Sequence, residues 1–308
     1  MKPIKEVKFV KEAMFGRKYR KWSYLETFFF LLKESIYKII DMGHRRLSAW
    51  LFIRKWRKKG KNGRYFDFNG IKLPDVPVRG VVFQLMNVFD DTFLSYCLFN
   101  DRYDKPFIET LDKYLSEGLY GYEDGAFDVT VKQGDVVIDA GAWMGDFSAY
   151  SAAKGATCYA FEPTATTFAI LCQTSKLNAG NILPIQKGLG DKECEVNIAI
   201  NEANSGANSI VMKQEYQREE KVSITTLDQF VAENNLTKID FIKADIEGAE
   251  RDMLRGASHV LKTFAPKLAI CTYHLSDDPQ VLEQIILDIN PNYTVVHLRH
   301  KLFAAVIK

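Results

Sequence analysis

The sequence predicts an α/β fold with a Rossmann-like, mainly parallel sheet and an additional helical segment at the N-terminus. Three observations support this prediction. Residues 135–162 follow the order strand, glycine turn, helix, strand and acid, which is how a nucleotide-binding α/β sheet begins. From residue 135 onwards, strand-like and helix-like stretches alternate. Residues 1–64 hold 19 Lys and Arg against five Asp and Glu, whereas the rest of the 308 residues hold 22 against 34, so the N-terminal segment is a separate basic arm.

The glycine turn is the most informative stretch. A β-branched run ends at Asp139, and the turn between Gly141 and Gly145 is followed by Asp146. Diphosphates prefer bare amides at a helix N-terminus, whereas acids suit a ligand with sulfonium and ammonium groups, such as S-adenosylmethionine. Glu162 ends the second strand, about twenty residues after the first glycine, where a carboxylate can bind ribose hydroxyls. The alternative is an ordinary tight turn without a ligand.

The composition is that of a soluble globular protein, with 47% hydrophobic and 26% charged residues. The five cysteines are scattered and form no CxxC pair, which predicts reduced thiols and a cytoplasmic location. No apolar run approaches the roughly 18 residues of a membrane span, and we expect no signal peptide.

The basic arm, residues 1–64, is expected to contain helices at roughly 23–41 and 45–58 and a linker at 58–64. Aromatic faces beside Lys and Arg clusters suit an interfacial helix on the anionic inner face of a membrane. Packing on the catalytic domain or on a second subunit is an equal alternative. No nucleic-acid-binding module is recognisable, and no nucleic acid is expected as a partner.

Residues 65–134 are predicted to form a cap region between the arm and a domain at 135–308. Turn residues occur at 65–77, and helices are expected at 91–100 and 106–115. The polar and aromatic loop at 119–125 precedes the domain directly. It is placed either to fold over a ligand or to serve as a surface connector.

Within the domain, the elements follow one another regularly and the chain closes with two strands joined by only three residues. That hairpin is typical of S-adenosylmethionine-dependent methyltransferases, whereas a dinucleotide dehydrogenase ends with a parallel sixth strand. The expected strands are 135–139, 157–161, 182–186, 239–245, 267–272, 293–298 and 302–307, with short β pieces at 195–200, 209–212 and 222–225 around a polar loop at 201–208. The expected helices are 146–153, 166–178, 226–234, one carrying the apolar residues of 249–261, and one beginning at Pro279.

Chemically useful residues fall where the predicted parallel strands end, and the carboxyl ends of parallel strands share one edge of the sheet. His274 follows the fifth strand and can accept a proton from a hydroxyl near neutral pH; a structural histidine is the alternative. Asp245 follows the fourth strand, beside the methyl donor or the acceptor hydroxyl; with Glu247 it is alternatively a helix N-terminal acid pair. Asp245, Glu247 and His274 together are also an alternative set of ligands for a divalent metal, but because no HxH or HExxH spacing supports that alternative, we expect no metal.

Three segments together resemble the FkbM family of S-adenosylmethionine-dependent methyltransferases, over about residues 130–308. They are VVIDAGAWMGDFSAYSA with its following Glu162-Pro163, IDFIKADIEGAE, and PKLAICTYH. The second holds a KxDxEGxE signature in Lys243, Asp245, Glu247, Gly248 and Glu250.

The resemblance implies a class I methyltransferase that uses S-adenosylmethionine to methylate a hydroxyl, usually on a sugar or natural product. A basic arm fits a lipid-linked or membrane-proximal glycan as acceptor. The rival readings are a non-catalytic protein that kept the fold and, with less support, a nicotinamide oxidoreductase. His274 and Asp245 are both candidates for the catalytic base. The residues expected to bind the cofactor are Asp139, Gly141, Ala142, Met144, Gly145, Asp146, Phe147, Glu162, Pro163, Lys187, Gly188 and Asp245.

Overall fold

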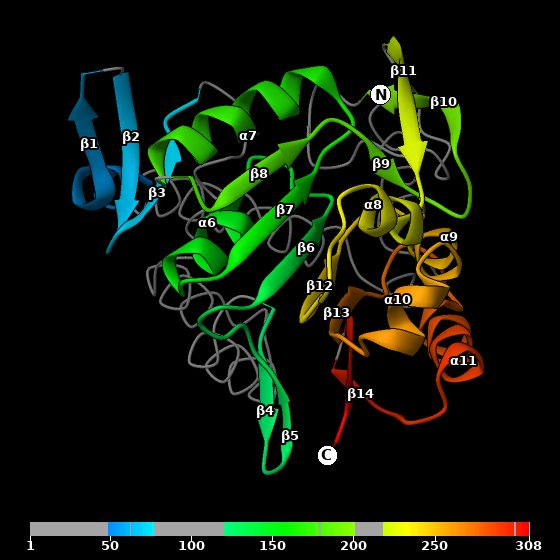
Figure 1. Cartoon of the computed structure of the whole chain (residues 1–308). Coiled ribbons are helices and arrows are strands. Elements are labelled where there is room, and N and C mark those ends of the chain that lie inside the picture. The colour runs from blue at the N-terminus through cyan, green and yellow to red at the C-terminus, as the bar shows by residue number, and fades with distance from the viewer. Residues whose placement is uncertain are drawn as a thin grey trace, which may run out of the picture.

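The computed structural model describes residues 49–61, 63–76, 120–178, 180–200, 218–298 and 300–307. A seven-stranded sheet with the order β14-β15-β13-β12-β6-β7-β8 forms its centre (Figure 1). The strands are β6 (Val136–Ala140), β7 (Thr157–Phe161), β8 (Ile182–Ile185), β12 (Phe241–Ala244), β13 (Lys267–Cys271), β14 (Tyr293–Leu298) and β15 (Lys301–Val306).

The pairing directions confirm the predicted α/β fold. Strands β13, β12, β6, β7 and β8 pair in parallel, whereas β15 runs antiparallel to both β13 and β14. The two closing strands are therefore the expected hairpin, added to the edge of a parallel sheet. Within the described ranges this is the strand arrangement expected for a class I methyltransferase.

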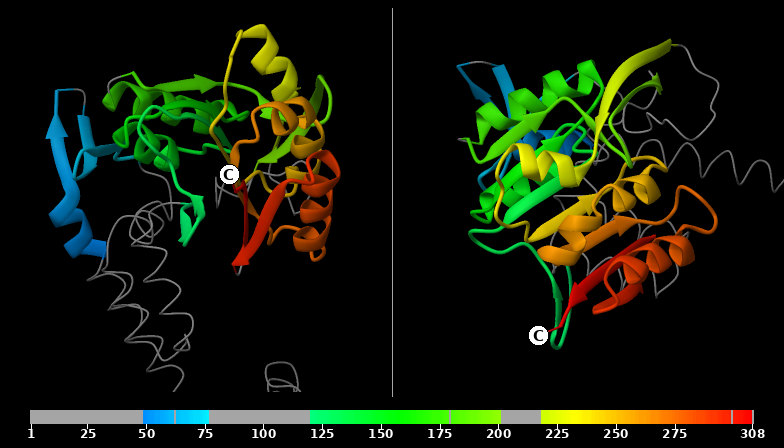
Figure 2. Two further views of the ribbon diagram at one scale, coloured as in Figure 1. Left: turned by 60° about the horizontal axis from the view of Figure 1, so that its bottom comes forward. Right: turned by 45° about the vertical axis from the view of Figure 1, so that its right-hand side comes forward.

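Helices cover both faces of the sheet (Figure 2). Alternate residues of a strand face opposite sides: Val137 and Phe241 pack in one core cluster with the helices α6 and α7, whereas Ile138 and Ile242 pack in a second cluster with α8 to α11. Burial on both faces explains why the central strands are mainly apolar, with Asp139 of β6 and Lys243 of β12 as buried charged exceptions. The helices are α6 (Asp146–Ala153), α7 (Ala165–Leu177), α8 (Leu227–Glu233), α9 (Glu250–Arg255), α10 (Ser258–Thr263) and α11 (Asp278–Ile289).

The apolar stretch at 249–261 is divided into two helices rather than one. The break lies at Gly256, where a Cβ atom would lie 2.0 Å from the carbonyl oxygen of Gly190. The backbone of this turn therefore packs directly on the loop after β9 (Gly188–Leu189). That strand forms a small sheet with β10 (Cys194–Ile200) and β11 (Arg218–Thr225), which confirms the short strands expected at 195–200 and 222–225.

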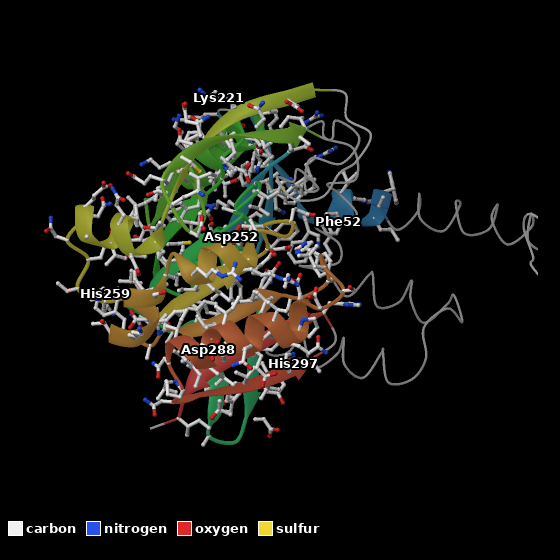
Figure 3. All side chains as sticks on the ribbon, turned by 90° about the vertical axis from the view of Figure 1, so that its right-hand side faces the viewer. Phe52, Lys221, Asp252, His259, Asp288 and His297 are labelled. Carbon is white, nitrogen blue, oxygen red and sulfur yellow. The ribbon has the colours of Figure 1, made fainter. Side chains whose placement is uncertain are left out.

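The end of the basic arm differs from the prediction. Residues 49–56 are helical. The run 58–64 was expected to be a linker, but residues 58–60 and 63–64 belong to an antiparallel sheet of β1 (Arg57–Gly60), β2 (Gly63–Phe68) and β3 (Ile71–Pro74). Alternating apolar residues in β2 explain the difference, because they pack against Phe52 (Figure 3), whose side chain is fully buried.

This small sheet is attached to the main domain. The side chain of Asn178, at the end of α7, accepts a hydrogen bond from the Lys72 amide and donates one to the Lys72 carbonyl, at 3.0 and 2.6 Å. Phe52 also belongs to the same core cluster as the buried residues of α6 and α7, so the helix at 49–56 packs on the domain. The elements expected at 23–41, 91–100, 106–115, 201–208 and 209–212 lie outside the described residues.

The hairpin of β4 (Tyr122–Asp124) and β5 (Phe127–Val129) leads into the domain. In the part of the chain that the structure describes, no helix has the length and apolarity needed to span a membrane.

Candidate active site

The glycine turn after β6 lies against the end of β12. Gly141 has φ +74°, and a Cβ atom there would lie 2.0 Å from the carbonyl oxygen of Asp245. Only glycine combines this left-handed backbone with so close an approach. The turn after the first strand and the signature after the fourth therefore form one surface.

Asp139 is held inside the fold. Its Oδ2 accepts a hydrogen bond from the Ser148 hydroxyl at 2.5 Å, and its Oδ1 lies 3.0 Å from the Lys243 ammonium. Lys243 also donates to the carbonyl oxygen of Gly141 at 2.7 Å. Burial opposes the charge of Lys243, but neighbouring carboxylates, Asp139 first, raise its pKa above the ordinary value. Asp139, expected to bind the cofactor, therefore ties β6 to β12.

Glu162 is fastened to the glycine turn. Its Oε1 accepts hydrogen bonds from the amide and hydroxyl of Thr164 and from the hydroxyl of Thr167. Among the described residues, Oε2 accepts a hydrogen bond from the Trp143 amide alone, at 3.1 Å. Burial raises the pKa of Glu162, and these hydrogen bonds oppose that effect. A carboxylate oxygen accepts about two hydrogen bonds, so Oε2 retains acceptor capacity for a ribose hydroxyl. A carboxylate oxygen that can accept from a ribose hydroxyl fits the nucleoside part of S-adenosylmethionine.

Asp146 begins α6, next to the turn. Burial raises the pKa of this carboxyl to about 6, although the Lys243 ammonium lowers it. Gly145 precedes it with φ +84°, and a Cβ atom there would lie 2.7 Å from Leu171 of α7. The glycine thus allows α6 and α7 to pack closely.

Other predicted cofactor residues lie in two groups. Ala142, Met144 and Phe147 are buried in the core cluster on the α6 side, so only their backbone is placed to meet a ligand. Gly188 starts β9, where a Cβ atom would lie 3.8 Å from Pro163, and Lys187 before it is half-buried. The segments that follow β7 and β8 therefore lie next to each other.

The KxDxEGxE signature forms the turn after β12. Glu250 is fully buried, and its two carboxylate oxygens accept the amides of Ile246 at 2.8 Å and Gly248 at 3.1 Å. Glu247 and Gly248 both have left-handed backbones, with φ +55° and +102°. The clamped turn places Glu247 beside Asp245.

The Asp245 carboxylate accepts hydrogen bonds from two tyrosine hydroxyls. Tyr120 donates its hydroxyl to Oδ2 at 2.8 Å, and Tyr273 donates to Oδ1 at 2.9 Å. Burial favours the neutral acid, but Lys243 and the tyrosine hydroxyls lower the pKa of Asp245 below its ordinary value. The loop at 119–125 thus reaches the site through Tyr120. The sequence placed Tyr273 at the end of the fifth strand and Tyr120 in the loop before the domain, but it assigned neither tyrosine a role.

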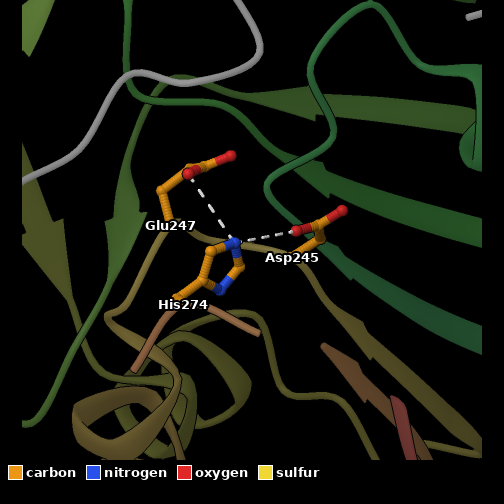
Figure 4. A group of neighbouring side chains, drawn as sticks. All are labelled: Asp245, Glu247 and His274. Atoms are coloured by element: carbon orange, nitrogen blue, oxygen red, sulfur yellow. Dashed lines mark ion pairs between the residues drawn. The ribbon is translucent and has the colours of Figure 1, made fainter. Parts of the chain in front are cut away.

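His274 lies between three carboxylates, of which Figure 4 shows those of Asp245 and Glu247. Its Nε2 is 3.5 Å from Asp245 Oδ1 and 3.6 Å from Glu247 Oε2, and its Nδ1 is 3.1 Å from Glu250 Oε1. Burial lowers the pKa of His274, but the carboxylates, Glu250 first, outweigh it and raise this pKa. The structure therefore brings together the two predicted catalytic residues and adds Glu250, which the sequence indicated only as part of the signature.

Comparison with protein families adds the deciding observation: the family described as Methyltransferase FkbM domain matches residues 135–298, slightly more than half of the chain. The chain belongs to the FkbM methyltransferase family. The resemblance carried by the glycine turn and the KxDxEGxE signature is thereby confirmed, and with it S-adenosylmethionine as the cofactor of the class.

Two curated proteins are similar to this FkbM-family chain. Hexuronic acid methyltransferase AglP of Haloferax volcanii is 25% identical over 158 residues, which cover 50% of this chain and 62% of the relative. Methyltransferase 1 of Beauveria bassiana is 27% identical over 156 residues, covering 43% and 63%. The chain thus spans less than two thirds of either relative.

Two solved structures are among those similar to this chain. An FkbM methyltransferase from Methylobacillus flagellatus aligns with a TM-score of 0.46 at 20% identity, covering 70% of this chain and 58% of the other. Fibrillarin of Aeropyrum pernix, solved with bound S-adenosylmethionine, aligns with a TM-score of 0.38 at 15% identity, covering 64% and 74%.

Proposed function

We propose that this protein is an S-adenosylmethionine-dependent O-methyltransferase that acts on a hydroxyl of a sugar or glycan. The observation that carries the proposal is that the expected cofactor-binding and catalytic residues lie along the same edge of the sheet. The Glu162 carboxylate and the Asp245–His274 pair both lie where parallel strands end, the region in which open α/β sheets bind ligands.

The residues of the turn would hold the cofactor. Glu162 Oε2 accepts a ribose hydroxyl, the turn at 141–145 supplies backbone, and the Asp146 carboxylate attracts the ligand's positive groups. The bound cofactor supplies a methyl group that an acceptor oxygen takes from the sulfonium sulfur, which keeps the electron pair of the broken C–S bond. The protein then mainly has to hold the acceptor in line, which lowers a barrier by roughly 7–11 kcal/mol in well-oriented cases.

The residues after β12 and β13 would hold the acceptor. Asp245 has a lowered pKa and accepts hydrogen bonds from both tyrosines, so its charge orients a hydroxyl. His274 and Asp245 both remain candidates to receive the hydroxyl proton. Tyr273 is 51% exposed and presents an aromatic ring beside Asp245 on which a sugar ring can rest.

A sugar acceptor is supported by the relative from Haloferax volcanii, whose name states a hexuronic acid as its substrate. A membrane-bound glycan at the cytoplasmic face is a finer form of the same proposal. It is supported by Trp50 and Leu51, which are 53% and 46% exposed beside Arg54, whose guanidinium lies 5.3 Å from the Trp50 ring. Exposed aromatic and basic residues suit an anionic membrane surface.

Calorimetry with S-adenosylmethionine and with NADH tests the class. We expect micromolar binding of the methyl donor and no NADH signal. Glu162→Gln should weaken binding about tenfold, as one lost charged hydrogen bond implies, whereas Glu283→Gln on the far helix α11 should not. Transfer of a labelled methyl group to hexuronic acid glycosides, with the product resolved as ether or ester, then tests the acceptor. Binding without transfer to any hydroxyl would favour the non-catalytic reading.

A further inference from the structure

We propose that Asp245, Glu247 and His274 bind a divalent metal ion that holds two neighbouring oxygens of the acceptor. The second part of the proposal rests on the function proposed above, whereas the first stands on the geometry alone. The three side chains come from the loops after β12 and β13, and their ligand atoms all lie within 4.8 Å of one another.

The separations suit a shared ion better than direct contact. His274 Nε2 lies 3.5 Å from Asp245 Oδ1 and 3.6 Å from Glu247 Oε2 (Figure 4). These distances exceed the usual 2.7–3.2 Å of a hydrogen bond. Two ligands placed about 2.1–2.4 Å from one ion, at right angles or somewhat wider, lie roughly 3.0–3.6 Å apart.

The imidazole supplies a second, independent observation. The side chain of His274 is 1% exposed, and within the described ranges both of its ring nitrogens are buried without a hydrogen-bond partner, although Nδ1 has the Glu250 carboxylate 3.1 Å away. Among the same residues, Nε2 has no carboxylate as near. A buried polar atom without a partner is costly, and this one points between the two carboxylates (Figure 4). A metal ion would satisfy it.

Glu250 completes the arrangement behind the ring. Its Oε1 lies 3.1 Å from Nδ1 of His274, and it is fixed by two backbone amides. It is therefore the carboxylate best placed to hold a proton on Nδ1, which leaves the lone pair on Nε2 for a ligand. Histidines that bind metals commonly have such a carboxylate behind them, which sets the tautomer and the ring orientation.

The opposite side of the ring is less suited to a metal. Glu250, His274 and Asp278 also lie close together, but Asp278 is already paired with the cationic Arg251 guanidinium at 2.8 Å. The hydrogen bonds that Asp245 accepts come instead from the uncharged hydroxyls of Tyr120 and Tyr273. On the Nε2 side, Asp245 and Glu247 are 25% and 16% exposed, so coordination positions would open towards solvent and the acceptor.

One imidazole and two carboxylates suit Mn²⁺, Fe²⁺ or Zn²⁺ better than a purely oxygen-bound ion such as Mg²⁺. A hydroxyl bound to such an ion loses its proton to water more readily. The hydroxyl oxygen is then ready to form the new C–O bond, and His274 acts as a metal ligand rather than as the proton acceptor. An ion with open positions favours acceptors that chelate, such as a vicinal diol or a hydroxy acid.

Titration of the chelator-treated full chain with MnCl₂, followed by electron paramagnetic resonance, tests the site without any substrate. We expect about one ion per chain with micromolar affinity. His274→Ala, Asp245→Asn and Glu247→Gln should each weaken binding at least about tenfold. His297→Gln is the matched control, because His297 also pairs with a glutamate, Glu283, but lies exposed on β14; its affinity should equal that of the wild type.

Absence of Mn²⁺ binding, or binding that all three substitutions leave unchanged, would overturn the proposal. His274 would then be a protonated imidazole surrounded by carboxylates and not a metal ligand. If His274→Ala does not fold, Glu247→Gln decides, because its carboxylate is partly exposed. S-adenosylmethionine calorimetry on the metal-free protein separates the two proposals. Cofactor binding without Mn²⁺ binding refutes only the metal site, whereas Mn²⁺ binding without cofactor binding supports the metal site and refutes the methyltransferase function.

Discussion

The ammonium group of Lys243 lies 3.0 Å from the Asp139 carboxylate, and both side chains are almost completely buried, at 5% and 0% exposure. Each charge is compensated by the other, because a buried charge without a partner is very costly. The pair also joins the two central strands β6 and β12, at whose ends the site is built.

Lys243→Met should therefore lower the free energy of unfolding by about 3–5 kcal/mol, because it leaves the Asp139 carboxylate buried without its partner. The urea midpoint measures this loss. Lys238→Met is the control: Lys238 pairs with Asp240 at the surface, and its loss should cost less than about 1 kcal/mol. Equal losses for the two variants would contradict the role of Lys243. Adding Asp139→Leu to Lys243→Met should restore part of the stability.

Gly141→Ala should destabilise the protein and weaken cofactor binding. The new Cβ atom would meet the Asp245 carbonyl at 2.0 Å, at a left-handed φ of +74°, so the turn and the end of β12 must separate. We expect a loss of more than about 2 kcal/mol in chemical denaturation.

Gly125→Ala provides the comparison, since Gly125 has a similar φ of +61° but nothing within 4 Å of the added atom. It should cost only about 1 kcal/mol for the backbone conformation. If the two alanine variants are equally stable, close packing at Gly141 is not what requires glycine there.

Much of this site was predictable because strand ends are visible in a sequence. The β-branched run before Asp139 and the stretch before Asp245 indicate buried parallel strands, and parallel topology alone brings their ends together. The hydrogen bond from the Trp143 amide to Glu162 was not predictable, because it depends on the left-handed backbone of Trp143 (φ +48°).

The partners of Asp245 and the hairpin in the arm were missed for a different reason. Tyr120 is 125 residues from Asp245 along the chain, and no local pattern encodes such a contact. In the arm, a run rich in Lys and Gly looks like a linker, whereas β1 and β2 are stabilised by apolar packing of Phe52 against Phe66, which again is distant in sequence. In such cases tertiary packing decides the secondary structure, even where the local strand propensity of the residues is low.

The Asp146 carboxyl predicts a stability that depends on pH. Its pKa is raised from 3.8 to about 6 by burial, so between these values the folded state binds more protons than the unfolded state. The carboxylate therefore reduces stability progressively as the pH rises from about 4 to about 6. The full shift corresponds to roughly 3 kcal/mol; because Asp146 is only half-buried, we expect about 1 kcal/mol.

Asp146→Asn should consequently be more stable than the wild type at about pH 8 and equal to it at about pH 4, measured by urea denaturation at both values. The same substitution should weaken cofactor binding, because it removes a negative charge next to the ligand. A variant that is less stable than the wild type at the higher pH would show that the carboxylate is stabilised, rather than strained, at the start of α6.

Tyr273→Phe should impair the use of the acceptor while sparing the cofactor. The variant keeps the exposed ring but loses the hydroxyl that donates to Asp245 Oδ1 at 2.9 Å. Without that hydrogen bond the carboxylate is free to turn away from its position beside His274, and a misplaced group costs about tenfold or more in rate. We expect kcat/KM for the acceptor to fall about tenfold with an unchanged Kd for S-adenosylmethionine. Tyr65→Phe, on β2 of the small N-terminal sheet, should change neither quantity. A loss of cofactor affinity in Tyr273→Phe would place Tyr273, and with it Asp245, on the cofactor side of the site instead.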